Sequence, residues 1–197
     1  MSQTNLFLVA EPKLFDKFLQ LLQKGVKVKA RVGSTVLSFL CDDLGLSPEY
    51  VDKRIQTLFL NGKAIDKPDA SLLKEDSTLA LSAAMPGLLG ATLRKGSYYA
   101  KMRSEISYQE QSTGATVHEG FVLLKLFNLL PSEVGPAVLA RGIWLKGEEL
   151  NQFLKGLPDD ILGMCSEAKA DGQAVNLKDF GEKSSKYELV LLRIQRA

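Results

Sequence analysis

The stretch "IQTLFLNGKAID", residues 55–66, contains the clearest local folding signal in the chain. Two runs rich in apolar residues flank the pair Asn61-Gly62. Asn-Gly most readily adopts the positive φ angles of a two-residue hairpin turn. The stretch therefore predicts a β-hairpin with its tight turn at residues 61–62.

Strand and helix signals lie on both sides of this hairpin. Upstream, "VKVKARVG" (26–33) alternates apolar and basic residues, which predicts a half-buried strand. "STVLSFLCDDLG" (34–45) has its apolar residues at helical spacing and predicts a helix over about 35–45. Downstream, "STLALSAAM" (77–85) is apolar enough for a central strand. The chain therefore runs strand, helix, hairpin, strand.

This order is that of the β-grasp fold, in which a helix packs across a mixed sheet. Residues 26–92 resemble the ubiquitin-like sulfur carriers, namely the small subunit of molybdopterin synthase and the thiamin sulfur carrier. The resemblance implies a β-grasp domain with a glycine-spaced tail after its last strand. The matching motifs are "FLNGKAID" (59–66), "LLKEDSTLAL" (72–81) and "AMPGLLGA" (84–91).

The chain departs from those carriers at the tail. The carriers end in a free Gly-Gly carboxylate, which is adenylated and then carries sulfur. Here Gly87 and Gly90 are not adjacent, and the chain continues to residue 197. We therefore expect "PGLLGA" (86–91) to be a structural exit from the sheet, with Leu88 and Leu89 partly buried.

The regions outside the β-grasp pattern also predict regular structure. "EPKLFDKFLQLLQKG" (11–25) predicts an amphipathic helix that packs on the protein's own core or on a partner. "FVLLKLF" (121–127) and "YELVLLRIQ" (187–195) predict two strands that pair, with helices between them. The overall prediction is an α+β protein with an N-terminal helix over 1–25, a β-grasp domain over 26–96 and an α+β domain of unrecognised type over 97–197.

Two clusters of basic residues are candidate binding sites. The outer side of the 26–33 strand either discourages edge pairing or faces an anion or an acidic partner. "LRKGSYYAKMR" (93–103) is either a solvated connector or a site for an anionic ligand or an acidic protein surface, because cations hold anions and tyrosines offer stacking faces. The candidates are Lys27, Lys29 and Arg31 in the first cluster, and Arg94, Lys95, Tyr98, Tyr99, Lys101 and Arg103 in the second.

Composition argues against several classes of function. A net charge of +2 is too small to indicate nucleic acid or membrane partners. Cys41 and Cys165 are far apart, and His118 is the single histidine, so we expect neither a disulfide framework nor a metal site. His118 is also the one candidate for the base that a serine or cysteine nucleophile needs, and we assign no catalytic residue.

The N-terminus lacks a basic segment before its short apolar run, and no apolar stretch approaches the roughly 18 residues of a membrane span. We therefore expect a cytoplasmic protein without a cofactor. The sequence favours a non-enzymatic protein-interaction module that docks on a protein partner or on another copy of itself. The alternatives are a sulfur-carrier-related protein of molybdopterin or thiamin biosynthesis and an anion- or nucleotide-binding protein.

Overall fold

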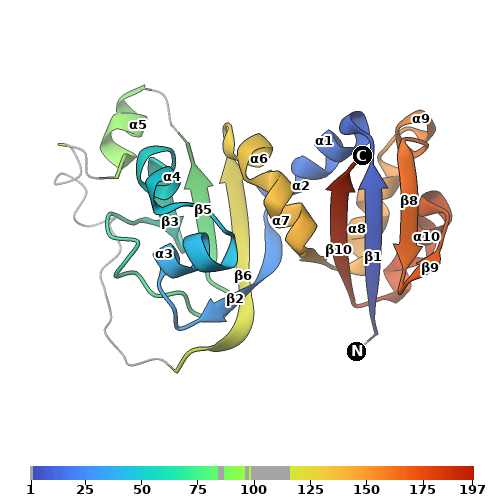
Figure 1. Ribbon diagram of the computed structural model, residues 1–197, viewed down its shortest axis with the longest axis horizontal. Coiled ribbons are helices and arrows are strands. Elements are labelled where there is room, and N and C mark those ends of the chain that lie inside the picture. The colour runs from blue at the N-terminus through green and yellow to red at the C-terminus, as the bar shows by residue number, and fades with distance from the viewer. Residues whose placement is uncertain (1, 84–86, 96–97, 99–115) are drawn as a thin grey trace. The chain divides into compact units, whose positions relative to one another are not determined.

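The structure is a computed structural model that describes residues 2–83, 87–95, 98 and 116–197 (Figure 1). It is of mixed α/β type and divides into two compact units. We call residues 1–26 with 132–197 the terminal unit, and residues 27–131 the inserted unit. These units differ from the predicted division at residue 96, because a strand of the chain's second half pairs inside the inserted unit.

The terminal unit is built on a sheet with the strand order β7-β10-β1-β8-β9. The first and last strands of the chain are parallel neighbours at its centre, with Leu6 opposite Leu192. β7 pairs antiparallel with β10, and β8 pairs antiparallel with β1 and β9. The strands are β1 (Gln3–Ala10), β7 (Ile143–Leu145), β8 (Cys165–Ala170), β9 (Gln173–Ala174) and β10 (Leu189–Arg196).

The closing strand was predicted correctly, but its predicted partner was wrong. β10 pairs with β1 and β7, not with the strand that contains 121–127. The missing partner was β1, in which Thr4, Leu6, Leu8 and Ala10 are buried in strict alternation. In the sequence, the apolar run over residues 6–10 was the available signal. The apolar runs of residues 121–127 and of β10 can each fill the centre of a sheet. Their composition therefore does not determine which strands pair.

Helices of the terminal unit bury their apolar faces in that unit's own core. The predicted N-terminal helix forms α1 and α2, and Leu14, Phe15 and Phe18 of α1 are buried. The Phe18 ring lies 5.1 Å from the Phe153 ring of α8, centroid to centroid. The helix therefore packs on the core. The helices are α1 (Pro12–Leu19), α2 (Leu21–Lys24), α7 (Gly135–Arg141), α8 (Gly147–Lys155), α9 (Asp159–Leu162) and α10 (Leu177–Lys183), with α6 (Leu130–Glu133) at the unit boundary.

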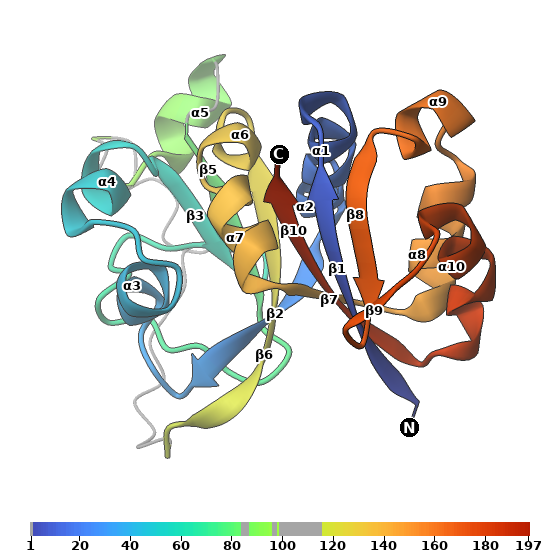
Figure 2. The same cartoon turned by 45° about the vertical axis from the view of Figure 1, so that its right-hand side comes forward.

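The inserted unit is built on a sheet with the strand order β4-β3-β5-β6-β2. β5 and β6 are parallel neighbours, with Leu79 opposite Leu124 (Figure 1; Figure 2 gives a second view). β3 pairs antiparallel with β5 and with β4. The strands are β2 (Val26–Val32), β3 (Thr57–Leu60), β4 (Lys63–Ala64), β5 (Thr78–Ser82) and β6 (His118–Phe127).

The hairpin and the helix predicted for this unit are both present. Asn61 and Gly62 have φ angles of 51° and 79°, as a tight turn between β3 and β4 requires. α3 (Val36–Ser38) continues into a π-helical turn over Phe39–Asp43, and the Thr35 side chain caps it by accepting a bond from the Ser38 backbone N–H. α4 (Pro48–Lys53) follows, with Ser47 as its N-cap.

The glycine-spaced segment after β5 is helical. β5 ends at Ser82, and residues Gly87–Leu93 form α5. The Lys95 backbone N–H then donates to the Gln56 carbonyl, at 2.7 Å. Pro86 and the burial of Leu88 and Leu89 lie outside the described residues. The segment is therefore helical from Gly87 to Leu93.

Candidate functional site

The predicted basic side chains of β2 are paired within the inserted unit. The Lys27 ammonium lies 2.7 Å from an Asp76 carboxylate oxygen, and the Lys29 ammonium lies 3.4 Å from Glu119. Each cation therefore has an acidic neighbour from the same unit. The side of β2 that the sequence marks as basic is a surface of mixed charge.

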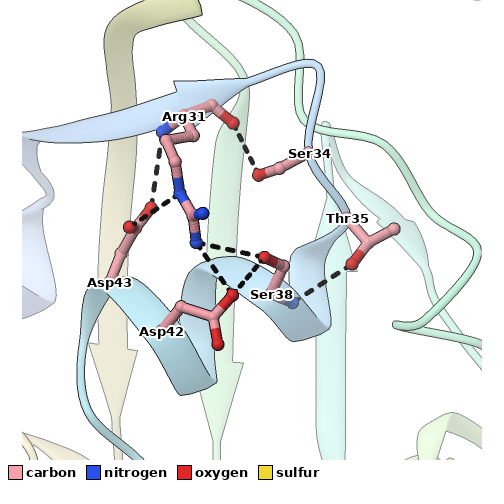
Figure 3. Close-up of polar contacts among 6 residues, drawn as sticks. All are labelled: Arg31, Ser34, Thr35, Ser38, Asp42 and Asp43. Atoms are coloured by element: carbon pink, nitrogen blue, oxygen red, sulfur yellow. Dashed lines mark hydrogen bonds and ion pairs between the residues drawn. The ribbon is translucent and has the colours of Figure 1, made fainter. Parts of the chain in front are cut away.

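Arg31, the third basic residue of β2, bonds to several side chains of the helix that follows the strand (Figure 3). Its guanidinium donates to Asp42 at 2.8 Å and to Asp43 at 3.1 Å. The Ser38 hydroxyl donates to Asp42 at 2.6 Å. The bonds from Ser38 and Arg31 lower the pKa of Asp42, and the two carboxylates raise the pKa of Arg31. This cluster ties β2 to the π-helical turn, so it positions the helix over the sheet.

The second predicted basic cluster is only partly described. The Lys95 side chain is 14% exposed, and its ammonium donates to the Val51 and Asp52 carbonyls and to the Asp52 carboxylate, each at 3.2 Å. These carbonyls belong to the last turn of α4, where a cation is stabilising. Arg94 and Tyr98 are exposed. Tyr99, Lys101 and Arg103 lie outside the described residues.

The sheet of the inserted unit has one buried face and one half-exposed face. In β6, Val122, Leu124 and Leu126 are fully buried, whereas the residues between them are not. Since side chains alternate along a strand, the residues between them point to the opposite face. We call this the outer face and define it by Phe59, Ala80, Leu123, Lys125 and Phe127.

Strand register determines which residues are neighbours on the outer face. Ala80 of β5 lies opposite Phe59 of β3 on one side and opposite Lys125 of β6 on the other. Leu123 and Phe127 are two positions from Lys125 along β6, and therefore share its face. Lys125 thus has apolar neighbours along β6 and on the β5 side, whereas β2 lies on its other side. Phe127 is 39% exposed.

The inserted unit also contains every large apolar side chain that is exposed among the described residues. Phe127 and Leu129, which is 55% exposed, lie at the end of β6. Val117 precedes β6, and Tyr98 follows α5. In the described part of the terminal unit, no large apolar side chain is exposed to this degree.

A buried polar atom lies at the edge of the outer face. Thr57 is 1% exposed and pairs with Ser82, which pairs in turn with Phe127. The Asn128 amide donates to the Ser82 hydroxyl at 2.5 Å. The Thr57 hydroxyl oxygen, like Gln56 Oε1, has no hydrogen-bond partner within the described chain. Such an atom destabilises the fold by about 1–3 kcal/mol, so this corner is not optimised for stability.

Cavities of the terminal unit lie beside α10. One of about 550 Å³ lies between β8 and the start of α10, and an adjoining one of about 520 Å³ extends toward Tyr187. In the first, the Lys178 ammonium is paired with Asp159 at 2.8 Å, which raises the pKa of Lys178. In the second, Asp171 accepts bonds from Asn5 and Thr4, which lower its pKa. These charges already serve the unit's own structure.

The single histidine and the two cysteines lie apart from any metal-binding cluster in the described residues. The His118 side chain is mostly exposed, and its Nε2 lies 3.9 Å from Glu75. Burial raises the pKa of the Cys41 and Cys165 thiols, which makes them less reactive. Across residues 2–83, 87–95, 98 and 116–197, no group of three or more His, Cys, Asp or Glu side chains is placed to hold a metal ion.

Among the described helices, none combines the length and apolar character needed to cross a bilayer. Comparisons with protein-family models, curated proteins and solved structures gave no match.

Proposed function

We propose that this protein is a non-catalytic protein-interaction module, and that its inserted unit docks a partner through the outer face. One observation carries the proposal: on the outer face, Phe127 is 39% exposed and Phe59 and Leu123 are only partly buried. The terminal unit contains a comparable sheet but lacks an exposed large apolar side chain among its described residues. Apolar exposure is therefore specific to one unit, as a dedicated docking surface requires.

We further propose that the inserted unit is a β-grasp domain with a changed chain order. In a β-grasp sheet, the first and last strands are parallel neighbours at the centre. Here β5 has such a neighbour in β6, which follows it in sequence. β2, the helix and β3 to β5 keep the β-grasp order. The arrangement fits a circularly permuted β-grasp domain, in which the usual first strand is the last along the chain.

Two observations favour docking over the alternative functions. α5 begins at Gly87, where a sulfur carrier would have its free tail. The Lys95 ammonium bonds to the end of α4, which reduces its capacity to hold a separate anion.

The proposal can be tested by capturing partners from a lysate of the native host on the immobilised full chain. Phe127→Ser should abolish capture of the bound protein, because it removes apolar area from the face. Phe7→Ser is the matched control, since Phe7 is a half-exposed strand residue of the terminal unit. Thermal unfolding would verify that both variants fold. Capture that survives Phe127→Ser but fails with Phe7→Ser would refute the proposal.

A further inference from the structure

We propose that Lys125 determines which partner the outer face accepts, and that this partner is an apolar protein segment with a carboxylate that reaches the Lys125 ammonium. The inference rests on the proposed docking function of the same face. It adds the chemical class of the partner and names the residue that selects it.

The position of Lys125 follows from the pairing of three strands. It lies opposite Ala80, and Ala80 lies opposite Phe59. Neighbouring strands are about 4.8 Å apart, so these side chains lie within reach of one another. Leu123 and Phe127 flank Lys125 on its own strand. A partner that covers these apolar groups must also cover Lys125.

Lys125 differs from the basic side chains of β2 in its surroundings. Lys27, Lys29 and Arg31 each have an acidic neighbour. Within the part of the chain that the structure describes, no carboxylate lies within ion-pair distance of the half-buried Lys125 ammonium. The basic side chains of β2 are thus ion-paired, whereas the charge of Lys125 remains available to a partner.

Because binding removes the Lys125 ammonium from water, its lack of an acidic neighbour discriminates between partners. An ammonium can extend its apolar stem along the sheet and keep its charged end in water while the face is open. A fully apolar partner would cover that charge without compensating it, which is costly. A partner carboxylate converts the same burial into a charge-assisted hydrogen bond. The face therefore favours acidic apolar segments and rejects those without an acid.

A phage-displayed library of random peptides, selected on the immobilised full chain, tests the inference. Wild-type protein should enrich peptides in which Asp or Glu is flanked by apolar residues. Lys125→Met should retain the apolar preference and lose the acidic one. Lys125→Glu should instead enrich Lys or Arg at that position. Phe127→Ser should remove the selected class, whereas Phe7→Ser should leave it unchanged.

Binding of a selected peptide then gives the quantitative test. Replacing its acid by the corresponding amide should weaken binding to wild-type protein by about tenfold, and binding to Lys125→Met by less than about twofold, as expected for a buried charge pair. Equal affinity of acid and amide for the wild type would overturn the role of Lys125 and leave the docking face intact. Failure to select any peptide, or peptides that bind Phe127→Ser equally well, would overturn the proposed function.

Discussion

The two units contain sheets with similar centres and different surfaces. β1 and β10 form the parallel pair of the terminal unit, and β5 and β6 form that of the inserted unit. An antiparallel neighbour pairs with β10 in one unit and with β5 in the other. The inserted unit leaves apolar side chains exposed on and beside β6, whereas the terminal unit does not among its described residues.

The units also differ at one buried hydroxyl, that of Thr57 in the inserted unit. In the terminal unit, Thr4 donates to Asp171 at 2.7 Å, Asn151 donates to the Gly181 carbonyl at 2.8 Å, and Ser184 donates to the Gly147 carbonyl at 3.0 Å. In the inserted unit, the Thr57 hydroxyl has no such partner in the described chain. Sheets with similar strand pairing can therefore differ in their surfaces. The inserted unit leaves apolar side chains exposed and the Thr57 hydroxyl without a partner among the described residues.

The largest expected effect tests which sheet contains β6. Leu124→Ala removes a fully buried side chain and should lower the free energy of unfolding by about 2–5 kcal/mol. Hydrogen exchange should accelerate in β5, whose Leu79 lies opposite. Leu192→Ala is the control, and it should accelerate exchange in β1. Faster exchange in β10 and not in β5 after Leu124→Ala would contradict the strand assignment.

The next effect compares the hairpin turns of the two units. Gly62 and Gly172 have φ angles of 79° and 84°, and a Cβ on either would meet no atom within 4 Å. Replacement by Val should therefore cost about 1 kcal/mol or more in either unit through backbone strain alone. Chemical denaturation of both variants measures this cost. An unchanged free energy of unfolding for Gly62→Val would argue against the tight turn.

A smaller effect should have opposite signs in the two units. Thr57→Val removes an unpartnered buried hydroxyl and should raise the free energy of unfolding by about 1 kcal/mol. Thr4→Val should lower it by about 1 kcal/mol, because Asp171 loses a hydrogen bond. Urea denaturation of the two variants provides the test. A loss of stability in Thr57→Val would mean that the hydroxyl has a partner after all.

The smallest effect concerns acid stability in the terminal unit. The bonds from Asn5 and Thr4 hold the pKa of Asp171 below its ordinary value of 3.8. This carboxylate therefore contributes stability above that ordinary value, and the contribution is lost as the pH falls through the lowered pKa. Asp171→Asn should be less stable than the wild type at pH 7, and the difference should shrink below about pH 4. A difference that persists unchanged in acid would exclude this linkage.

The sequence predicted the candidate surfaces only in part. It marked Lys27, Lys29 and Arg31 by their alternation, but their acidic partners include Asp76 and Glu119, which are distant in sequence. Lys125 was not singled out, although alternation in "FVLLKLF" (121–127) places it on the same side as Leu123 and Phe127. Its significance depends on Ala80 and Phe59, which only strand pairing brings beside it.

The sequence alone determined the hairpin at Asn61-Gly62, the presence of a helix after β2 and the alternation within β2. These features depend on backbone angles and bonds between residues close along the chain. The tertiary structure decided that β6 lies beside β5 and that β10 lies beside β1. The apolar runs of β6 and β10 suit a central strand equally well. Their partners are therefore chosen by burial summed over distant segments, which no local pattern contains.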